Sequence, residues 1–192
     1  MKYDFLLVGL GNIGQQYELT RHNFGFLLVD QIIDDYNFSL VAARKFDAEM
    51  FSGKIADKNV VVIKPQTFMN RSGIAVASMV NFYKIPLASI IVCHDDLDLE
   101  LGRIKVKVGG GNGGHNGLKS IDSMVGKNYS RIRLGIGTAE RDKFNTSNYV
   151  LGNFSTAQLQ LVKNINTKIS QLLPHILDNR FDLFLNKFTI ER

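Results

Sequence analysis

Three clusters of polar residues carry the side chains that could act on a substrate, and each follows an apolar segment of strand length. The clusters are Asn12 with His22, the run His94-Asp95-Asp96, and residues 109–117, which hold six glycines, His115 and Asn116. In an open α/β sheet, side chains at strand ends converge on a ligand. A histidine, a carboxylate and several carboxamides that meet there indicate hydrolysis.

His22 is the candidate general base. It lies in the segment Thr20-Arg21-His22-Asn23, just before an expected helix and outside the apolar periodicity of that helix. Imidazole suits this task near neutral pH, provided that a carboxylate bonded to its other nitrogen enforces the right tautomer. Asp95 and Asp96 are both candidates for that carboxylate.

Water is the expected nucleophile. No serine lies in a nucleophile-elbow pattern, and the single cysteine, Cys93, falls inside an apolar strand where a buried thiol is inert. Attack on an ester or amide generates an oxyanion, which neutral donors stabilise. The carboxamides of Asn12, Asn70 and Asn116 are candidate donors, as are free backbone amides at the start of the helix expected after Asn116.

A metal hydrolase is one alternative, because residues 94–98 contain a histidine and three aspartates. On an extended segment, however, Asp95 points away from the face that carries His94 and Asp96. No pair of the His-x-x-x-His kind occurs either. We therefore expect no metal and no other cofactor.

Two glycine-rich segments are similar to nucleotide-binding loops. Gly9-Leu10-Gly11-Asn12-Ile13-Gly14 matches the dinucleotide fingerprint, but some nine residues separate Gly14 from the next helical pattern. A pyrophosphate there would lack the helix N-terminus that it needs. Residues 109–117 carry His115 where the loop of a nucleotide triphosphatase has lysine. Their exposed amides still allow a bulky substrate to come close.

The apolar patterns predict an α/β fold in a single domain that covers residues 1–192. Strands are expected at 3–8, 50–56, 60–64, 89–93, 102–108 and 131–137, and helices at 23–36, between Ser72 and Pro86, and at 117–125, 155–174 and 182–187. Asn116 is the expected cap of the third helix, and Pro174 the expected end of the fourth. Because crossovers alternate with hairpins, we expect a mixed, twisted sheet with helices on both faces.

Positive charge is concentrated in one segment. The net charge is +5, and residues 103–133 contain seven basic residues against the single acid Asp122. Arg103, Lys105 and Lys107 alternate with apolar residues, so one face of that strand should be basic. This pattern favours a polyanionic partner, with a solvated basic face as the alternative.

The sequence favours a cytosolic protein that does not bind membranes. The start, Met1-Lys2-Tyr3-Asp4, passes directly into an apolar strand without the cleavage site of a signal peptide. No apolar run approaches the ~18 residues needed to span a bilayer. A single cysteine fits a reducing compartment.

Together, these motifs resemble bacterial-type peptidyl-tRNA hydrolases over essentially the whole chain. They are Gly9-Leu10-Gly11-Asn12, Thr20-Arg21-His22-Asn23, Lys64-Pro65-Gln66-Thr67-Phe68-Met69-Asn70-Arg71-Ser72-Gly73, His94-Asp95-Asp96-Leu97-Asp98, and residues 109–117 with Leu118-Lys119, in the family's order. The resemblance implies a monomeric cytoplasmic enzyme that hydrolyses the ester between a peptide, or an N-blocked amino acid, and the 3′ end of tRNA. It also implies recycling of tRNA after premature drop-off.

The resemblance further implies roles for individual residues. His22 would be the catalytic base, Asp95 its orienting partner, and Asn116 the residue that positions water or the developing oxyanion. The residues implied in substrate binding are Asn12, Tyr17, Phe68, Met69, Asn70 and His115, with Phe68 stacking on the terminal adenosine. The residues implied in binding tRNA phosphates near the acceptor end are Lys105, Lys107 and Arg133.

The chain departs from the family's pattern at Ile13, Asp96 and the pair Glu100-Leu101, none of which touches the implied base or its partner. Two other classes of function stay open at this point. A non-catalytic RNA-binding module would explain the basic strand but gives no reason for His22 and Asp95. A serine or cysteine esterase would require a residue that an active-site inhibitor can trap covalently.

Overall fold

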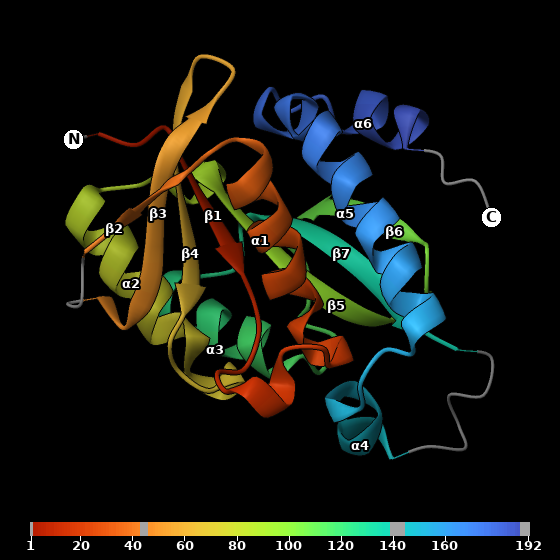
Figure 1. Cartoon of the computed structure of the whole chain (residues 1–192). Helices are drawn as coiled ribbons and strands as arrows, with labels where there is room; N and C mark the ends of the chain where they lie inside the picture. The colour runs from red at the N-terminus through yellow and green to blue at the C-terminus, as the bar shows by residue number, and fades with distance from the viewer. Residues whose placement is uncertain (1, 43–45, 139–144, 189–192) are drawn as a thin grey trace.

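The computed structural model describes residues 2–42, 46–138 and 145–188, and its centre is a seven-stranded sheet in the order β2-β3-β4-β1-β5-β7-β6 (Figure 1). The strands are β1 Phe5–Gly9, β2 Ser39–Val41, β3 Ala48–Ile55, β4 Lys58–Pro65, β5 Ile90–Glu100, β6 Ile104–Val108 and β7 Ser130–Gly137. Strands β4, β1, β5 and β7 are parallel, whereas β2, β3 and β6 add antiparallel pairs at the two margins. The prediction of an α/β fold with a mixed sheet is confirmed.

Helices cover both faces of the sheet (Figure 1). They are α1 Phe24–Asp35, α2 Ser72–Tyr83, α3 Asn116–Val125, α4 Thr146–Leu151, α5 Thr156–Leu177 and α6 Phe181–Lys187. Leu7 of β1 joins the core formed with α1 and α5, whereas its neighbours Leu6 and Val8 join the core formed with α2 and α3. This alternation follows from the two-residue period of a strand. Within the described ranges, no helix has the length and apolarity to cross a bilayer.

Helix α5 does not end at Pro174, as the sequence had predicted, but continues to Leu177. A proline inside a helix removes the N–H that would bond to the carbonyl four residues earlier, here that of Ser170. The hydroxyl of Tyr36 donates to this carbonyl at 2.9 Å. A side chain from the end of α1 thus replaces the missing backbone donor, which a local sequence pattern does not reveal.

Strand β5 is longer than predicted, and its extension creates the site. The sequence placed its end at Cys93, but β5 runs on to Glu100. Its pairing with β1 ends at Gly9 opposite Cys93, while its pairing with β7 continues through Asp96. From residue 94 onward, one edge of β5 is therefore open to the loops that follow β1.

Gly25 brings α1 against this open edge. A Cβ atom at position 25 would collide with the carbonyl oxygen of Cys93 and with the backbone of Leu10. Only glycine allows this close approach. It brings the 3-10 helix η2, Arg21–Asn23, with His22 at its centre, beside β5.

Candidate active site

A cavity of about 850 Å³ opens beside the carboxyl ends of β1 and β5. Its lining includes most of the residues singled out in the sequence, namely Asn12, His22, Phe68, Met69, Asn70, Asp95, Lys107, His115, Asn116 and Arg133. Tyr17, in the 3-10 helix η1 Gln15–Tyr17, and Lys105 of β6 are not among the lining residues. The three polar clusters of the sequence therefore meet in one place.

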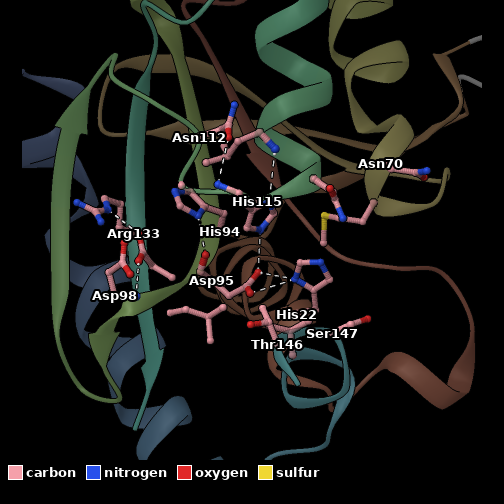
Figure 2. Close-up of a pocket in the computed structure, with 18 of the residues that line it drawn as sticks. His22, Asn70, His94, Asp95, Asp98, Asn112, His115, Arg133, Thr146 and Ser147 are labelled. Atoms are coloured by element: carbon pink, nitrogen blue, oxygen red, sulfur yellow. Dashed lines mark hydrogen bonds and ion pairs between the residues drawn. The ribbon is translucent and has the colours of Figure 1, made fainter. Parts of the chain in front are cut away.

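The centre of the cavity is a trio of side chains, His22, Asp95 and His115 (Figure 2). Nδ1 of His22 lies 3.0 Å from both carboxylate oxygens of Asp95. Nε2 of His115 lies 2.9 Å from Oδ1 of the same carboxylate. One carboxylate thus binds two imidazoles, and Asp95 rather than Asp96 is the partner of His22.

Burial and hydrogen bonding set the charges of this trio. Burial alone would lower the pKa of His22, but the charge and the hydrogen bond of Asp95 raise it above its ordinary value of 6.5. Burial alone would raise the pKa of Asp95, but the two imidazoles hold it well below its usual range. Burial lowers the pKa of the neighbouring His94 to about 3, so His94 stays neutral. Asp95 is therefore an ionised carboxylate at neutral pH.

The same trio is the group of described residues whose ligand-type atoms lie close enough to hold a metal ion, all within 4.8 Å of one another. It differs from the group considered in the sequence, which consisted of residues 94–98. In the present arrangement, a ring nitrogen of each histidine bonds to Asp95. A metal would have to replace both of these bonds.

Cys93 lies in the strand, as expected, and is fully buried. Burial raises the pKa of its thiol far above the ordinary range. A thiol that stays protonated is a poor nucleophile. The side chain packs in the apolar core with Leu7 and Ile91 instead of lining the cavity.

Asn12 is held in place by bonds on both its side chain and its backbone. Its carboxamide oxygen accepts a hydrogen bond from the backbone N–H of Met69 at 2.9 Å. Its backbone N–H donates to Oδ1 of Asn23 at 2.8 Å, and its backbone carbonyl accepts from Nδ2 of Asn23 at 2.9 Å. The first bond uses the oxygen of the Asn12 carboxamide and so fixes the direction of its NH2 group. Asn23, the residue after His22, therefore positions this loop. The sequence analysis did not single it out.

The helix cap predicted at Asn116 is in fact His115. Nδ1 of His115 accepts hydrogen bonds from the backbone N–H groups of Gly117 and Leu118, at 3.1 and 3.4 Å. Asn116 is instead the first residue of α3, with an exposed side chain on the cavity. Asn116 thus lines the cavity without serving as the helix cap.

Residues 6–192 match the family described as peptidyl-tRNA hydrolase. The chain belongs to the peptidyl-tRNA hydrolase family. The peptidyl-tRNA hydrolase of Rickettsia canadensis is 44% identical over 181 residues, which are 94% of this chain and 97% of the relative. That of Rickettsia conorii is 44% identical over 182 residues, covering 95% of this chain and 98% of the relative.

A crystal structure of peptidyl-tRNA hydrolase from Acinetobacter baumannii has the same fold. It matches with a TM-score of 0.89 and 34% sequence identity, over 100% of this chain and 98% of the other. Membership of the peptidyl-tRNA hydrolase family, and with it the prediction of a hydrolase, is confirmed.

In this member of the peptidyl-tRNA hydrolase family, α4 forms a wall of the cavity that the sequence analysis missed. Thr146, Ser147, Val150 and Leu151 line the cavity beside His22 (Figure 2). Arg21, the residue before His22, stacks on Tyr149 with its guanidinium carbon 4.5 Å from the ring centroid. Its Nη1 also donates to the backbone carbonyl of Tyr149 at 3.3 Å. Arg21 thus ties α4 to the segment that carries His22.

The basic strand lies at one end of the cavity. Lys105 of β6 is directly opposite Arg133 of β7, and Lys107 is opposite Arg131, so the four side chains share one face of the sheet. Lys105 and Lys107 are exposed, but Nε of Arg133 donates to Asp96 at 2.6 Å. Part of the charge of Arg133 is therefore balanced within the protein.

Arg131 differs from its basic neighbours because it is buried. Its guanidinium donates to Oδ1 of Asp122 at 3.0 Å and to the backbone carbonyl of Gly111 at 2.8 Å. Tyr129 donates to the same Asp122 oxygen at 2.7 Å. Arg131 therefore anchors the glycine-rich loop to α3, and it does not belong to a solvated basic face.

Proposed function

We propose that the chain hydrolyses the ester between a peptide, or an N-blocked amino acid, and the 3′ end of tRNA, with His22 as the general base. The observation that carries this proposal is the 3.0 Å contact between Nδ1 of His22 and the ionised carboxylate of Asp95. Family membership supports the substrate class, because the relatives named above are peptidyl-tRNA hydrolases.

Asp95 fixes the tautomer that a base needs. A carboxylate can only accept, so Nδ1 of His22 donates its proton to Asp95 and Nε2 keeps a lone pair. Nε2 lies on the side of the ring away from Asp95 (Figure 2). A water molecule at Nε2 can lose a proton to it while attacking the ester carbonyl, and Asp95 stabilises the imidazolium that forms.

The rest of the reaction follows from this geometry. Attack by water breaks the carbonyl π bond and places a negative charge on the carbonyl oxygen, toward which the carboxamides of Asn116, Asn70 and Asn12 can donate. Collapse of this intermediate breaks the bond to the ribose oxygen, and the imidazolium of His22 returns its proton to that oxygen. The products are tRNA with a free 3′ end and a peptide carboxylic acid, which releases its proton to solvent and becomes a carboxylate.

The carboxamides also suit an N-blocked substrate. An N-acyl amide can bond to Asn12 and Asn70 without the burial of a charge, whereas a free α-amino group is charged or strongly hydrated. Met69 and the half-exposed Phe68 would line the groove for the peptide and the terminal adenosine. Tyr17 and His115 complete the proposed substrate-binding set.

The tRNA itself would approach along the basic face. Lys105 and Lys107 of β6 and Arg133 of β7 share one face of the sheet, and the last two line the cavity, so they could neutralise phosphates of the acceptor stem. The proposed protein is a single-domain monomer that works in the cytoplasm. It recycles tRNA from peptidyl-tRNA released by premature drop-off.

The experiment that tests this function is hydrolysis of N-acetyl-aminoacyl-tRNA by the purified protein with a chelator present. We expect wild-type protein to cleave it, and His22→Ala to lose about 10²–10⁴ in rate, the usual contribution of a general base. His175→Ala is the matched control, because His175 lies in α5 outside the cavity lining. Wild-type rates in the His22→Ala protein would refute the assignment of the base, and loss of wild-type activity in chelator would indicate a metal.

A further inference from the structure

His115 belongs to two hydrogen-bonded systems at once. Its Nε2 lies 2.9 Å from Oδ1 of Asp95, inside the cavity. Its Nδ1 receives the backbone N–H groups of Gly117 and Leu118, at the start of α3. Both ring nitrogens therefore bond within the protein, and any contact between His115 and a substrate is left to the carbon edge of the ring.

These contacts leave His115 with one tautomer. Because two N–H donors point at Nδ1, that nitrogen must keep its lone pair, and the proton of the neutral ring must lie on Nε2. A second proton on Nδ1 would oppose both backbone donors. It would also place a positive charge at the N-terminus of α3, the positive end of the helix dipole. The N–H at Nε2 of His115 is thus directed at Asp95.

Among the residues that the structure describes, the ionisable groups that face the ring of His22 are Asp95 of β5 and His115 before α3, whose ring centroid is 4.9 Å away. His94 of β5 lies behind His115, with ring centroids 5.1 Å apart, and is neutral. Helix α4 adds only uncharged residues to the lining, and Arg21 turns its guanidinium toward Tyr149.

We propose that His115 is a positioning residue, which orients the Asp95 carboxylate and leaves His22 as the imidazole of the pair whose Nε2 can act as the base. The proposal rests on the proposed function, because it concerns which histidine serves as the base. His115 acts through Asp95. The N–H of His115 fixes the plane of the Asp95 carboxylate and offsets part of the negative charge of that carboxylate. Helix α3 fixes His115 in turn.

Two substitutions test separately the bond at Nε2 of His115 and the bonds at its Nδ1. In His115→Asn, the carboxamide oxygen can replace Nδ1 as the cap of α3, but the side chain is too short to reach Asp95. In His115→Gln, the amide nitrogen can reach the position of Nε2 and donate to Asp95, while the cap is lost. The pair therefore distinguishes the bond to Asp95 from a merely structural role.

We expect the larger kinetic effect in His115→Asn. Its kcat should fall about 10- to 100-fold, as for the loss of one hydrogen bond to a charged group. The acid limb of its pH profile should move to higher pH, because the whole charge of Asp95 then acts on His22. His115→Gln should lose less kcat than His115→Asn, and its acid limb should move less, while its Tm falls by about 2–4 °C through loss of the cap.

The NMR titration of the imidazole nitrogens tests the same inference without substrate. We expect the neutral ring of His115 to carry its proton on Nε2 and none on Nδ1. A protonated Nδ1 on His115, or equal pH profiles for wild type and His115→Asn, would overturn the inference. If the wild-type protein cleaved no blocked aminoacyl-tRNA, the proposed function would fail, whereas the NMR result would still decide the state of His115.

Discussion

The cavity has two kinds of wall. The trio of His22, Asp95 and His115 is hydrogen bonded within the protein, and Asp95 and His22 are only 3% and 8% exposed. The rim, which we define as Phe68, Asn70 and Asn116, is exposed, and Phe68 reaches 56%. The trio is therefore set before a substrate arrives, whereas the rim can complete its contacts with the substrate. Substitutions in the trio should change kcat, and those in the rim should divide between kcat and KM.

The strongest test of this contrast is Asp95→Asn. Asparagine offers one acceptor oxygen and one NH2 group, where the carboxylate accepts from two imidazoles. Because α3 fixes the tautomer of His115, His22 would have to face the NH2 group and turn its lone pair toward it. We expect kcat on N-acetyl-aminoacyl-tRNA to fall about 10²–10⁴-fold with little change in KM. A decrease smaller than tenfold would show that the trio is not the catalytic centre.

Within the rim, Asn116 and Asn70 should behave differently. We expect Asn116→Ala to lower kcat about 10²–10³-fold if its carboxamide stabilises the oxyanion. Asn70→Ala should mainly raise KM, because this side chain would hold the substrate in the ground state as well. Steady-state kinetics on one blocked aminoacyl-tRNA measures both variants, and equal changes in kcat and KM for the two residues would remove the distinction.

The pH dependence should report the trio and not the rim. A general base works only when neutral, so kcat should fall about tenfold for each unit of pH below the pKa of His22. Asp95 raises that pKa above 6.5, so the fall should begin above the pH expected for a free histidine. The same limb should persist in Asn70→Ala. An acid limb centred below 6.5 would contradict the contact between His22 and Asp95.

The smallest effect should come from the basic face. We expect Lys105→Ala to weaken tRNA binding a few-fold and to reduce the slope of log Kd against log salt by about one phosphate contact. The chemical step on a short blocked substrate should not change. Lys163→Ala, an exposed lysine of α5, is the matched control. An unchanged slope in Lys105→Ala would show that this face contributes to solubility and not to tRNA binding.

The sequence predicted the sheet and the identity of most cavity residues, because strand periodicity and the order of polar motifs are local signals. The residue pattern alone left Asp95 and Asp96 open, and only the family resemblance favoured Asp95, since that choice depends on β5 continuing past the end of β1. It placed the helix cap at Asn116, because asparagine is a common cap and histidine is not. The sequence also did not reveal that Arg133 pairs with Asp96 or that Arg131 is buried, because both depend on contacts between distant elements.

Helix α4 gave almost no signal in the sequence. It is six residues long and carries one buried residue, Val150, so it has almost no periodic signal. Its place at the cavity depends on Arg21, which lies 128 residues before Tyr149. Short elements that are held by distant partners are those that a single sequence reveals least.

Gly25 has a consequence for how the enzyme could lose activity. This glycine carries no polar side chain, yet a single added methyl group would push the start of α1 away from β5. His22 precedes it by three residues and would be carried along, out of reach of Asp95. A larger side chain at this apolar position could therefore abolish catalysis by a steric clash, although every polar group of the cavity would still be present.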